Sequence, residues 1–344
     1  MSRLKPLQTG QTKCYDQDGN EIPCEGAGQD GTDRFGLAWP DSRFEVEGDV
    51  VQDRLTGLGW TKNANLNEFP LTWQESLDYV KGLNDENLFG HGDWRLPNRR
   101  ELHSLMAYGT RKPALPAGHP FENYFLGWYW TSTSAAINPA YAWYLHLEGA
   151  RMFYGRKDQY YLVWPVRGEG SSVLARSGQV DCYDEKGGPI DCTGTGQDGE
   201  YRLGVSMPAP RFVAENETVA DRLTGLVWLK DADLTKGPVS WREALAAVEE
   251  LNRVGVGGRK GWRLPNIRVL EALIDCSRSS PALPEDNPFI NLGETYWSST
   301  TSFFETDWAW ALYLEKGALG VGFKKDRGFH VWPVSMEGVR LRAG

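Results

Sequence analysis

The residues with the clearest chemical potential are four cysteines that form two pairs of identical spacing. The pairs bracket residues 14–24 and 182–192, and a hairpin-type turn, Asp18-Gly19-Asn20 or Lys186-Gly187-Gly188, lies between the two thiols of each pair. A metal site would need more closely spaced cysteines and nearby His ligands. We therefore expect the disulfides Cys14–Cys24 and Cys182–Cys192, with reduced thiols or a metal site as the alternatives. Disulfides favour an exported protein.

A second candidate is the segment 301–308, in which aromatic rings alternate with carboxylates. Such a combination suits stacking on sugar rings or docking of a protein. The alternative is that the rings pack into the neighbouring domain. The candidate ligand-binding residues are Phe303, Phe304, Glu305, Asp307 and Trp308, together with Tyr141 in the matching segment of the first half.

A third candidate is a set of basic side chains in the first half of the chain. The second half has Ile267, Ser279, Ser280 and Ala318 at several of the matching positions. This difference predicts a face for anions or sulfated glycans on the first half, and an ordinary solvated surface is the alternative. The candidate residues are Arg99, Arg100, Arg111, Lys112, Arg151 and Arg156.

The sequence shows no other familiar site pattern. Each of the five histidines occurs in only one half, and no Gly-rich phosphate loop or HExxH motif is found. Asp16, Asp18 and Asn20 imitate the start of a calcium loop, but Ala27 stands where the bidentate Glu is required, which favours a simple turn. We expect Cys276 to be a buried thiol, and we expect no catalytic residue, metal or cofactor.

Arg95 and Asp53 recur at the same spacing as Arg263 and Asp221. A fixed setting for opposite charges predicts buried ion pairs rather than catalytic groups.

The bulk composition limits the classes of partner. A net charge of −9 disfavours nucleic acid and anionic membranes. No apolar run is long enough to span a membrane. The first residues have no hydrophobic stretch behind them, which predicts either a cytosolic protein or a chain without its leader.

The elements that position the candidates occur twice, about 168 residues apart. A period of this length is a whole domain, so we expect repeats at 8–168 and 176–336, joined by a linker at 169–175. The matching motifs are 53–58 and 221–226 (Asp-Arg-Leu-Thr-Gly-Leu), 94–98 and 262–266 (Trp-Arg-Leu-Pro-Asn), and 163–166 and 331–334 (Val-Trp-Pro-Val).

Each repeat is expected to be an α+β domain of two helices and a curled antiparallel sheet. Capping boxes at Thr72 and Ser240 predict helices that run to residues 84 and 252, and Asn98 and Asn266 are expected to cap a second helix in each repeat. The predicted strands are 44–51 and 57–61, followed by 128–133, 142–147 and 160–166 in the first repeat and by 296–300, 309–314 and 329–334 in the second.

These motifs, with the opening Thr9–Asp16 segment and the Trp297–Thr300 strand, resemble the Lcl C-terminal domain family of bacteria. The resemblance implies a C-type-lectin-like fold, more distantly similar to formylglycine-generating enzymes, and an adhesin that binds sulfated glycans. The calcium-sugar triplets Glu-Pro-Asn and Trp-Asn-Asp of lectins are absent, and the last third of each repeat has no cysteine, so neither their sugar site nor that enzyme chemistry carries over.

The sequence therefore predicts an exported, non-enzymatic binding or adhesion protein, extracellular, periplasmic or on the cell surface, that recognises a glycan or a surface protein. The alternatives are a structural subunit of a surface assembly, which would form homo-oligomers, and an enzyme of unknown chemistry.

Overall fold

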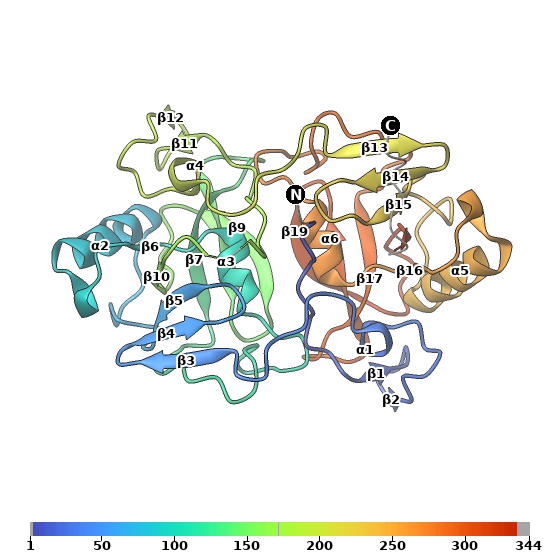
Figure 1. Ribbon diagram of the computed structural model, residues 1–344, viewed down its shortest axis with the longest axis horizontal. Coiled ribbons are helices and arrows are strands. Elements are labelled where there is room, and N and C mark those ends of the chain that lie inside the picture. The colour runs from blue at the N-terminus through green and yellow to red at the C-terminus, as the bar shows by residue number, and fades with distance from the viewer. Residues whose placement is uncertain (1–2, 171, 336–344) are drawn as a thin grey trace. The chain divides into compact units, whose positions relative to one another are not determined.

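The computed structural model describes residues 3–170 and 172–335, which divide into two compact units. Unit 1 combines the chain up to Leu37 with Met207–Ile274 and the segment that starts at Arg278, and unit 2 combines Ala38–Ser206 with Asp275–Ser277. In Figure 1 the blue N-terminal hairpin accordingly lies among the orange and red elements of unit 1. The compact units thus differ from the sequence repeats 8–168 and 176–336, because each unit takes its cysteine hairpin from the other repeat.

Both units contain a five-stranded antiparallel sheet with the same strand order, as the repeat predicts. In unit 2 the order is β3-β4-β5-β10-β6, and in unit 1 it is β13-β14-β15-β20-β16. The strands of unit 2 are β3 (Phe44–Glu47), β4 (Val50–Asp53), β5 (Leu58–Thr61), β6 (Trp94–Arg95) and β10 (Val166–Arg167). Those of unit 1 are β13 (Phe212–Glu215), β14 (Thr218–Asp221), β15 (Val227–Leu229), β16 (Trp262–Arg263) and β20 (Val334–Ser335).

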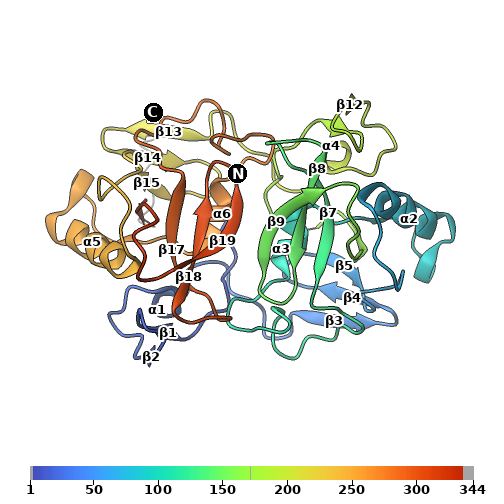
Figure 2. The same ribbon diagram turned by 180° about the vertical axis from the view of Figure 1, so that it is seen from behind.

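Each unit also contains three consecutive antiparallel strands, which Figure 2 shows from behind. The first two were predicted, but the expected third strands, 160–166 and 329–334, are wrong over most of their length. The third strand comes earlier, in segments whose glycines obscure the strand pattern. The strands are β7 (Trp128–Ser134), β8 (Tyr141–His146) and β9 (Arg151–Arg156), and β17 (Thr295–Thr301), β18 (Trp308–Tyr313) and β19 (Ala318–Phe323).

The long helices α2 (Trp73–Asp85) and α5 (Trp241–Val254) begin as predicted. Thr72 and Ser240 each accept a bond from the third helical N–H, and Glu75 and Glu243 bond back to complete both capping boxes. The predicted second helices are α3 (Arg99–Ser104) and α6 (Ile267–Leu273). Two short helices, α1 (Asp30–Asp33) and α4 (Asp198–Tyr201), follow the hairpins β1 (Cys14–Tyr15)–β2 (Glu21–Ile22) and β11 (Cys182–Tyr183)–β12 (Pro189–Ile190).

Tryptophan side chains fill both cores, and several buried indole N–H groups donate to backbone carbonyls. Trp73 donates to Thr131 O at 2.7 Å, and Trp241 donates to Ser298 O at 2.7 Å in the same position of unit 1. These bonds fix each long helix to the first strand of the three-stranded set, because a buried indole needs an acceptor. The result is a repeated α+β domain.

Candidate functional site

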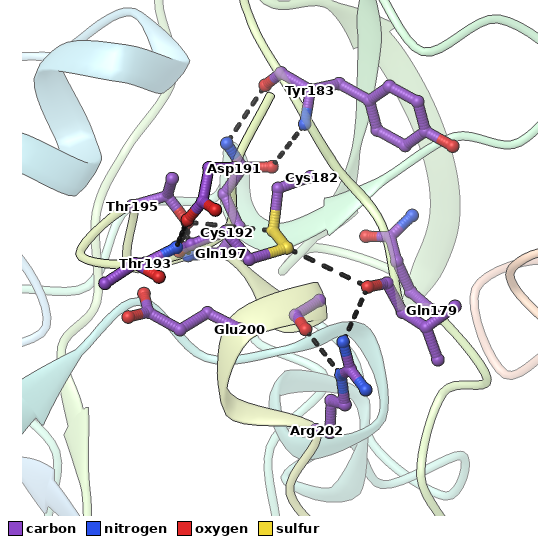
Figure 3. The surroundings of a disulfide bond; sticks show 12 residues. Gln179, Cys182, Tyr183, Asp191, Cys192, Thr193, Thr195, Gln197, Glu200 and Arg202 are labelled. Carbon is purple, nitrogen blue, oxygen red and sulfur yellow. Dashed lines mark hydrogen bonds between the residues drawn. A yellow bond between two sulfur atoms is a disulfide. The ribbon is translucent and has the colours of Figure 1, made fainter. Parts of the chain in front are cut away.

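Both predicted disulfides are present, at Cys14–Cys24 and Cys182–Cys192. Figure 3 shows the second one, beside Tyr183 and Gln197. The Gln197 amide accepts from the Tyr183 N–H at 3.0 Å and donates to its carbonyl at 2.9 Å, and Gln29 does the same to Tyr15 in unit 1. Each hairpin is therefore closed covalently and tied to the short helix behind it.

The Asp16 side chain stabilises the tip of the first hairpin. Its carboxylate accepts from the N–H groups of Asp18 (2.8 Å) and Asn20 (2.9 Å) and from the Asn20 side chain (3.0 Å). The Asn20 side chain is the main cause that lowers the pKa of Asp16. The carboxylate is thus committed to shaping the hairpin tip.

A fully buried lysine fastens each hairpin to its unit. In unit 1, Lys324 lies 4.1 Å from the centre of the Trp241 ring and donates to the carbonyls of Tyr15 (3.3 Å) and Asp16 (3.0 Å). Lys157 makes the same contacts in unit 2, with Trp73 and the carbonyls of residues 183 and 184. Burial lowers the pKa of each lysine to about 7, and both ammonium groups serve to hold the hairpins.

A buried aspartate makes a second fastening. Asp30 accepts from the Thr300 hydroxyl at 2.7 Å and from the Asn266 amide at 3.3 Å, and Asp198 accepts from the Thr133 hydroxyl at 2.6 Å. Burial raises the pKa of Asp30 and of Asp198 to about 6. The four groups whose pKa values are shifted to about 6 or 7 therefore all lie buried under the hairpins. They are Asp30, Asp198, Lys157 and Lys324.

A groove of about 790 Å³ opens in unit 1 between the hairpin segment and the helix α5. Residues spaced three or four apart on α5 form one wall, as expected for a single helix face. The hairpin and α1 form the other wall, and β16 lies at the base. The groups that line it include Asp16, Asp18, Asp33, Arg242, Leu245, Glu249, Trp262 and Arg263.

Two donors at this groove have no partner among the residues that the structure describes. They are the indole N–H of Trp262 and the Nε–H of Arg263, both buried. Arg263 is 22% exposed and contacts Asp33, which is 29% exposed, at 3.1 Å. Buried unpaired donors are rare in native structures, and each calls for an explanation such as a ligand or water.

Unit 2 has a smaller groove of about 370 Å³, lined by the equivalent residues of α2, β6 and the second hairpin segment. There the Trp94 indole donates to Leu88 O at 3.0 Å. Glu200 and Tyr201 stand where unit 1 has Thr32 and Asp33. The Glu200 carboxylate accepts from two backbone N–H groups, of residues 194 and 196. The polar groups of this groove are thus largely satisfied within the protein.

One sequence difference between the repeats explains why Arg95 and Arg263 have different partners. In unit 2, Arg95 donates to both oxygens of Glu101, at 2.6 and 2.7 Å, and to Gly168 O at 2.7 Å, and is 6% exposed. The residue that corresponds to Glu101 in unit 1 is Val269. Arg263 has no such carboxylate behind it and instead faces Asp33 at the groove.

The buried ion pairs were predicted with the wrong partners. Asp53 pairs with Arg43, with atoms at 3.0 and 2.8 Å, and Asp221 pairs with Arg211 at 3.0 and 2.9 Å. Arg43 and Arg211 were not singled out in the sequence because no shared motif surrounds them. Arg95 pairs with Glu101 instead, and Arg263 pairs with Asp33.

The aromatic segment 301–308 lies against the N-terminal hairpin. The Phe303 ring contacts the Tyr15 ring edge-on at 6.5 Å, and the Thr306 hydroxyl donates to Gly19 O at 2.8 Å. Trp308 packs on Phe323 at 5.7 Å. Phe303, Phe304, Asp307 and Trp308 are half-buried, Glu305 is exposed, and Tyr141 in unit 2 is half-buried against Tyr154.

The six basic candidates do not form one surface. Arg99 is buried with its guanidinium 3.9 Å from the Trp143 ring centre, and Arg100 is buried and donates to Arg176 O at 3.1 Å. Lys112 pairs with Glu148, and Arg156 with Asp158. Arg111, Lys112, Arg151 and Arg156 are exposed. Cys276 is a buried thiol, as predicted, and burial raises its pKa.

The groove was missed because Trp262 and Arg263 belong to the Trp-Arg-Leu-Pro-Asn motif that both repeats share, which was interpreted as scaffold. One sequence difference could have indicated the groove. The first repeat has Glu101 where the second has Val269, whereas the Trp-Arg-Leu-Pro motif beside this position is the same in both. Within the described residues, no helix combines the length and apolar character needed to cross a membrane.

Comparison with known proteins agrees with the repeated architecture. No curated protein matches the chain. The Lcl C-terminal domain family matches residues 49–167 and again residues 217–335, more than half of the chain in total. Both matched regions begin after the cysteine hairpins, so the hairpins lie outside the matched residues. The chain therefore belongs to the Lcl C-terminal domain family, whose domain it carries twice.

Proposed function

We propose that this protein is an exported, non-enzymatic binding protein that recognises a glycan in the groove of unit 1. The observation that carries the proposal is the pair of unpaired buried donors, Trp262 Nε1 and Arg263 Nε, beside that groove. The equivalent indole in unit 2 is satisfied internally. A ligand that supplies acceptors would remove the cost of the unpaired donors.

The charges of the groove favour a ligand that also donates hydrogen bonds. Four carboxylates line it, from Asp16, Asp18, Asp33 and Glu249, against two guanidinium groups. Hydroxyl groups both donate and accept, and their bonds to carboxylates are among the stronger hydrogen bonds. A neutral, hydroxyl-rich glycan satisfies both needs, whereas a sulfated glycan would meet twice as many carboxylates as guanidinium groups.

The position of the groups with strongly shifted pKa values supports a binding role over catalysis. The large shifts toward a neutral pKa belong to Asp30, Asp198, Lys157 and Lys324, and each of these groups fastens a hairpin. A general acid or base works best with a pKa near the operating pH and with access to substrate. These four groups are buried under the hairpins instead.

The disulfides support an exported location, since such bonds persist in oxidising compartments. We also propose that each unit is C-type-lectin-like, in line with its helices, antiparallel sheets and long irregular segments. Ligand binding in the groove requires neither the exported location nor the C-type-lectin-like fold.

A glycan array with the full chain tests the function. The variant Arg242→Ala/Glu249→Ala removes two side chains from the exposed face of α5 and should weaken binding at least about tenfold. Its matched control is Gln74→Ala/Lys81→Ala, the equivalent positions of unit 2, which should leave binding unchanged.

Two outcomes would contradict the proposal. One is that no neutral glycan binds. The other is that sulfated glycans bind best and are released by salt, because the acceptor-rich groove cannot then be the site.

A further inference from the structure

Exposed aromatic side chains gather around a second, apolar pocket of about 290 Å³ on unit 2. Phe125, Trp128, Tyr160 and Tyr161 line it, together with Glu68, and it shares no lining residue with either groove. Tyr160 is 63% exposed and Phe125 is 55% exposed. Exposed apolar patches of this kind mark surfaces that bind a ligand, a protein or a membrane.

The walls of this pocket are held in place before any ligand arrives. The Trp128 ring packs on Tyr144 at 4.3 Å, and the Tyr161 ring packs on Trp130 at 4.7 Å. The Phe125 N–H donates to the buried Tyr129 hydroxyl at 2.8 Å. Rings that are already fixed lose little entropy on binding.

The fold does not require these residues. At the matching positions of the second repeat, Gly328 replaces Tyr160, Thr295 replaces Trp128 and Lys236 replaces Glu68. The same strands form in unit 1 without the rings. The rings of Trp128 and Tyr160 and the carboxylate of Glu68 are therefore specific to the first repeat, and the second repeat has a positive charge where the first has a negative one.

We propose that this pocket binds a quaternary or methylated ammonium group. The faces of aromatic rings attract cations, and the attraction strengthens when water is excluded. The Glu68 carboxylate adds a complementary charge, and the lining of the pocket contains no basic side chain. Because most of the lining is hydrocarbon, it suits a cation that has no N–H groups to satisfy. A sugar would leave most of its hydroxyl groups without partners.

A titration of the full chain with choline and with its neutral isostere, 3,3-dimethylbutan-1-ol, tests the proposal by ligand-observed NMR. Choline should bind at least about tenfold more tightly than the alcohol, since only the cation gains from the ring faces. Two variants copy the second repeat, Glu68→Lys and Tyr160→Gly, and each should weaken choline binding at least about fivefold. Phe89→Ala, an exposed ring outside the pocket, is the control and should change nothing.

The proposal is overturned if choline and the alcohol bind equally, because the pocket is then merely apolar. It is also overturned if choline does not bind saturably or if methyl glycosides bind in preference to it. The inference is independent of the glycan groove, so Arg242→Ala/Glu249→Ala should leave choline binding intact. A loss in that variant would place the cation in the groove instead.

Discussion

The contrast between Arg95 and Arg263 leads to a prediction with a defined magnitude. The substitution Glu101→Val copies unit 1 into unit 2 and removes both carboxylate contacts of Arg95, at 2.6 and 2.7 Å. Arg95 is 6% exposed and Glu101 is 4% exposed, so the guanidinium remains as a buried charge that only Gly168 O still contacts. Breaking a buried pair in this way costs about 3–5 kcal/mol.

A smaller loss adds to this cost. The Glu101 carboxylate also accepts from the Asn98 N–H at 2.8 Å and so closes the capping box of α3. The loss of a cap costs about 1 kcal/mol. Since Arg95 keeps its carbonyl partner, we expect a total decrease of about 4 kcal/mol in the free energy of unfolding.

A second substitution should restore part of the stability. Tyr201→Asp places a carboxylate where unit 1 has Asp33, the partner of Arg263 at 3.1 Å. Tyr201 is 42% exposed, so this substitution alone should cost less than about 1 kcal/mol. In the double variant it should recover about 2 kcal/mol, the size of coupling expected for residues in direct contact.

Urea unfolding of the wild type, both single variants and the double variant gives the complete cycle. The reasoning is refuted if Glu101→Val costs less than about 1 kcal/mol. It is equally refuted if the two substitutions add independently, because Arg95 would then not depend on a carboxylate in either place.

Three further predictions follow from the same contacts. The substitution Val269→Glu supplies the carboxylate that unit 1 lacks and should draw Arg263 away from the groove. Glycan binding, measured by titration calorimetry, should then weaken about tenfold. Unchanged affinity would contradict the role of Arg263. Asp30 and Asp198 have a pKa raised to about 6, so they stabilise the fold at low pH, and this contribution is lost as the pH rises through 6. Urea unfolding at several pH values should therefore show that the free energy of unfolding of the wild type declines between about pH 4 and 6. The variant Asp30→Asn/Asp198→Asn should lack this decline. An equal decline in both proteins would exclude these two groups as its cause. The variant Cys14→Ser/Cys24→Ser opens a short covalent loop and should lower the free energy of unfolding by about 3 kcal/mol. Urea unfolding without reductant measures this change. A change below about 1 kcal/mol would show that Lys324 and Asp30 suffice to hold the hairpin.

The sequence predicted the elements whose signals are local. Capping residues precede every long helix, and turn residues close both cysteine hairpins, so the helix starts and the disulfides were predicted correctly. The third strand of each set was missed because Gly155, Gly320 and Gly322 interrupt its pattern. A Cβ at Gly322 would lie 2.2 Å from the Phe329 ring, so this glycine is required by packing that no local pattern reveals.

The exchange of hairpins between the repeats could not be predicted from local signals. Asp30 bonds to Thr300, 270 residues away, and Gln11 bonds to Thr301, 290 residues away. Each of these residues has an equivalent in the other repeat that would fit equally well by type. The residue types at these contacts therefore do not indicate which hairpin joins which domain.

We expect the ligand to occupy the groove of unit 1 and not the aromatic segment 301–308. A crystal structure of the full chain with the tightest-binding neutral glycan tests it most directly. We predict that a hydroxyl of the glycan accepts from Trp262 Nε1 or Arg263 Nε and that another donates to Asp33 or Glu249. A glycan bound at Phe304 and Trp308, with the groove empty, would contradict the account.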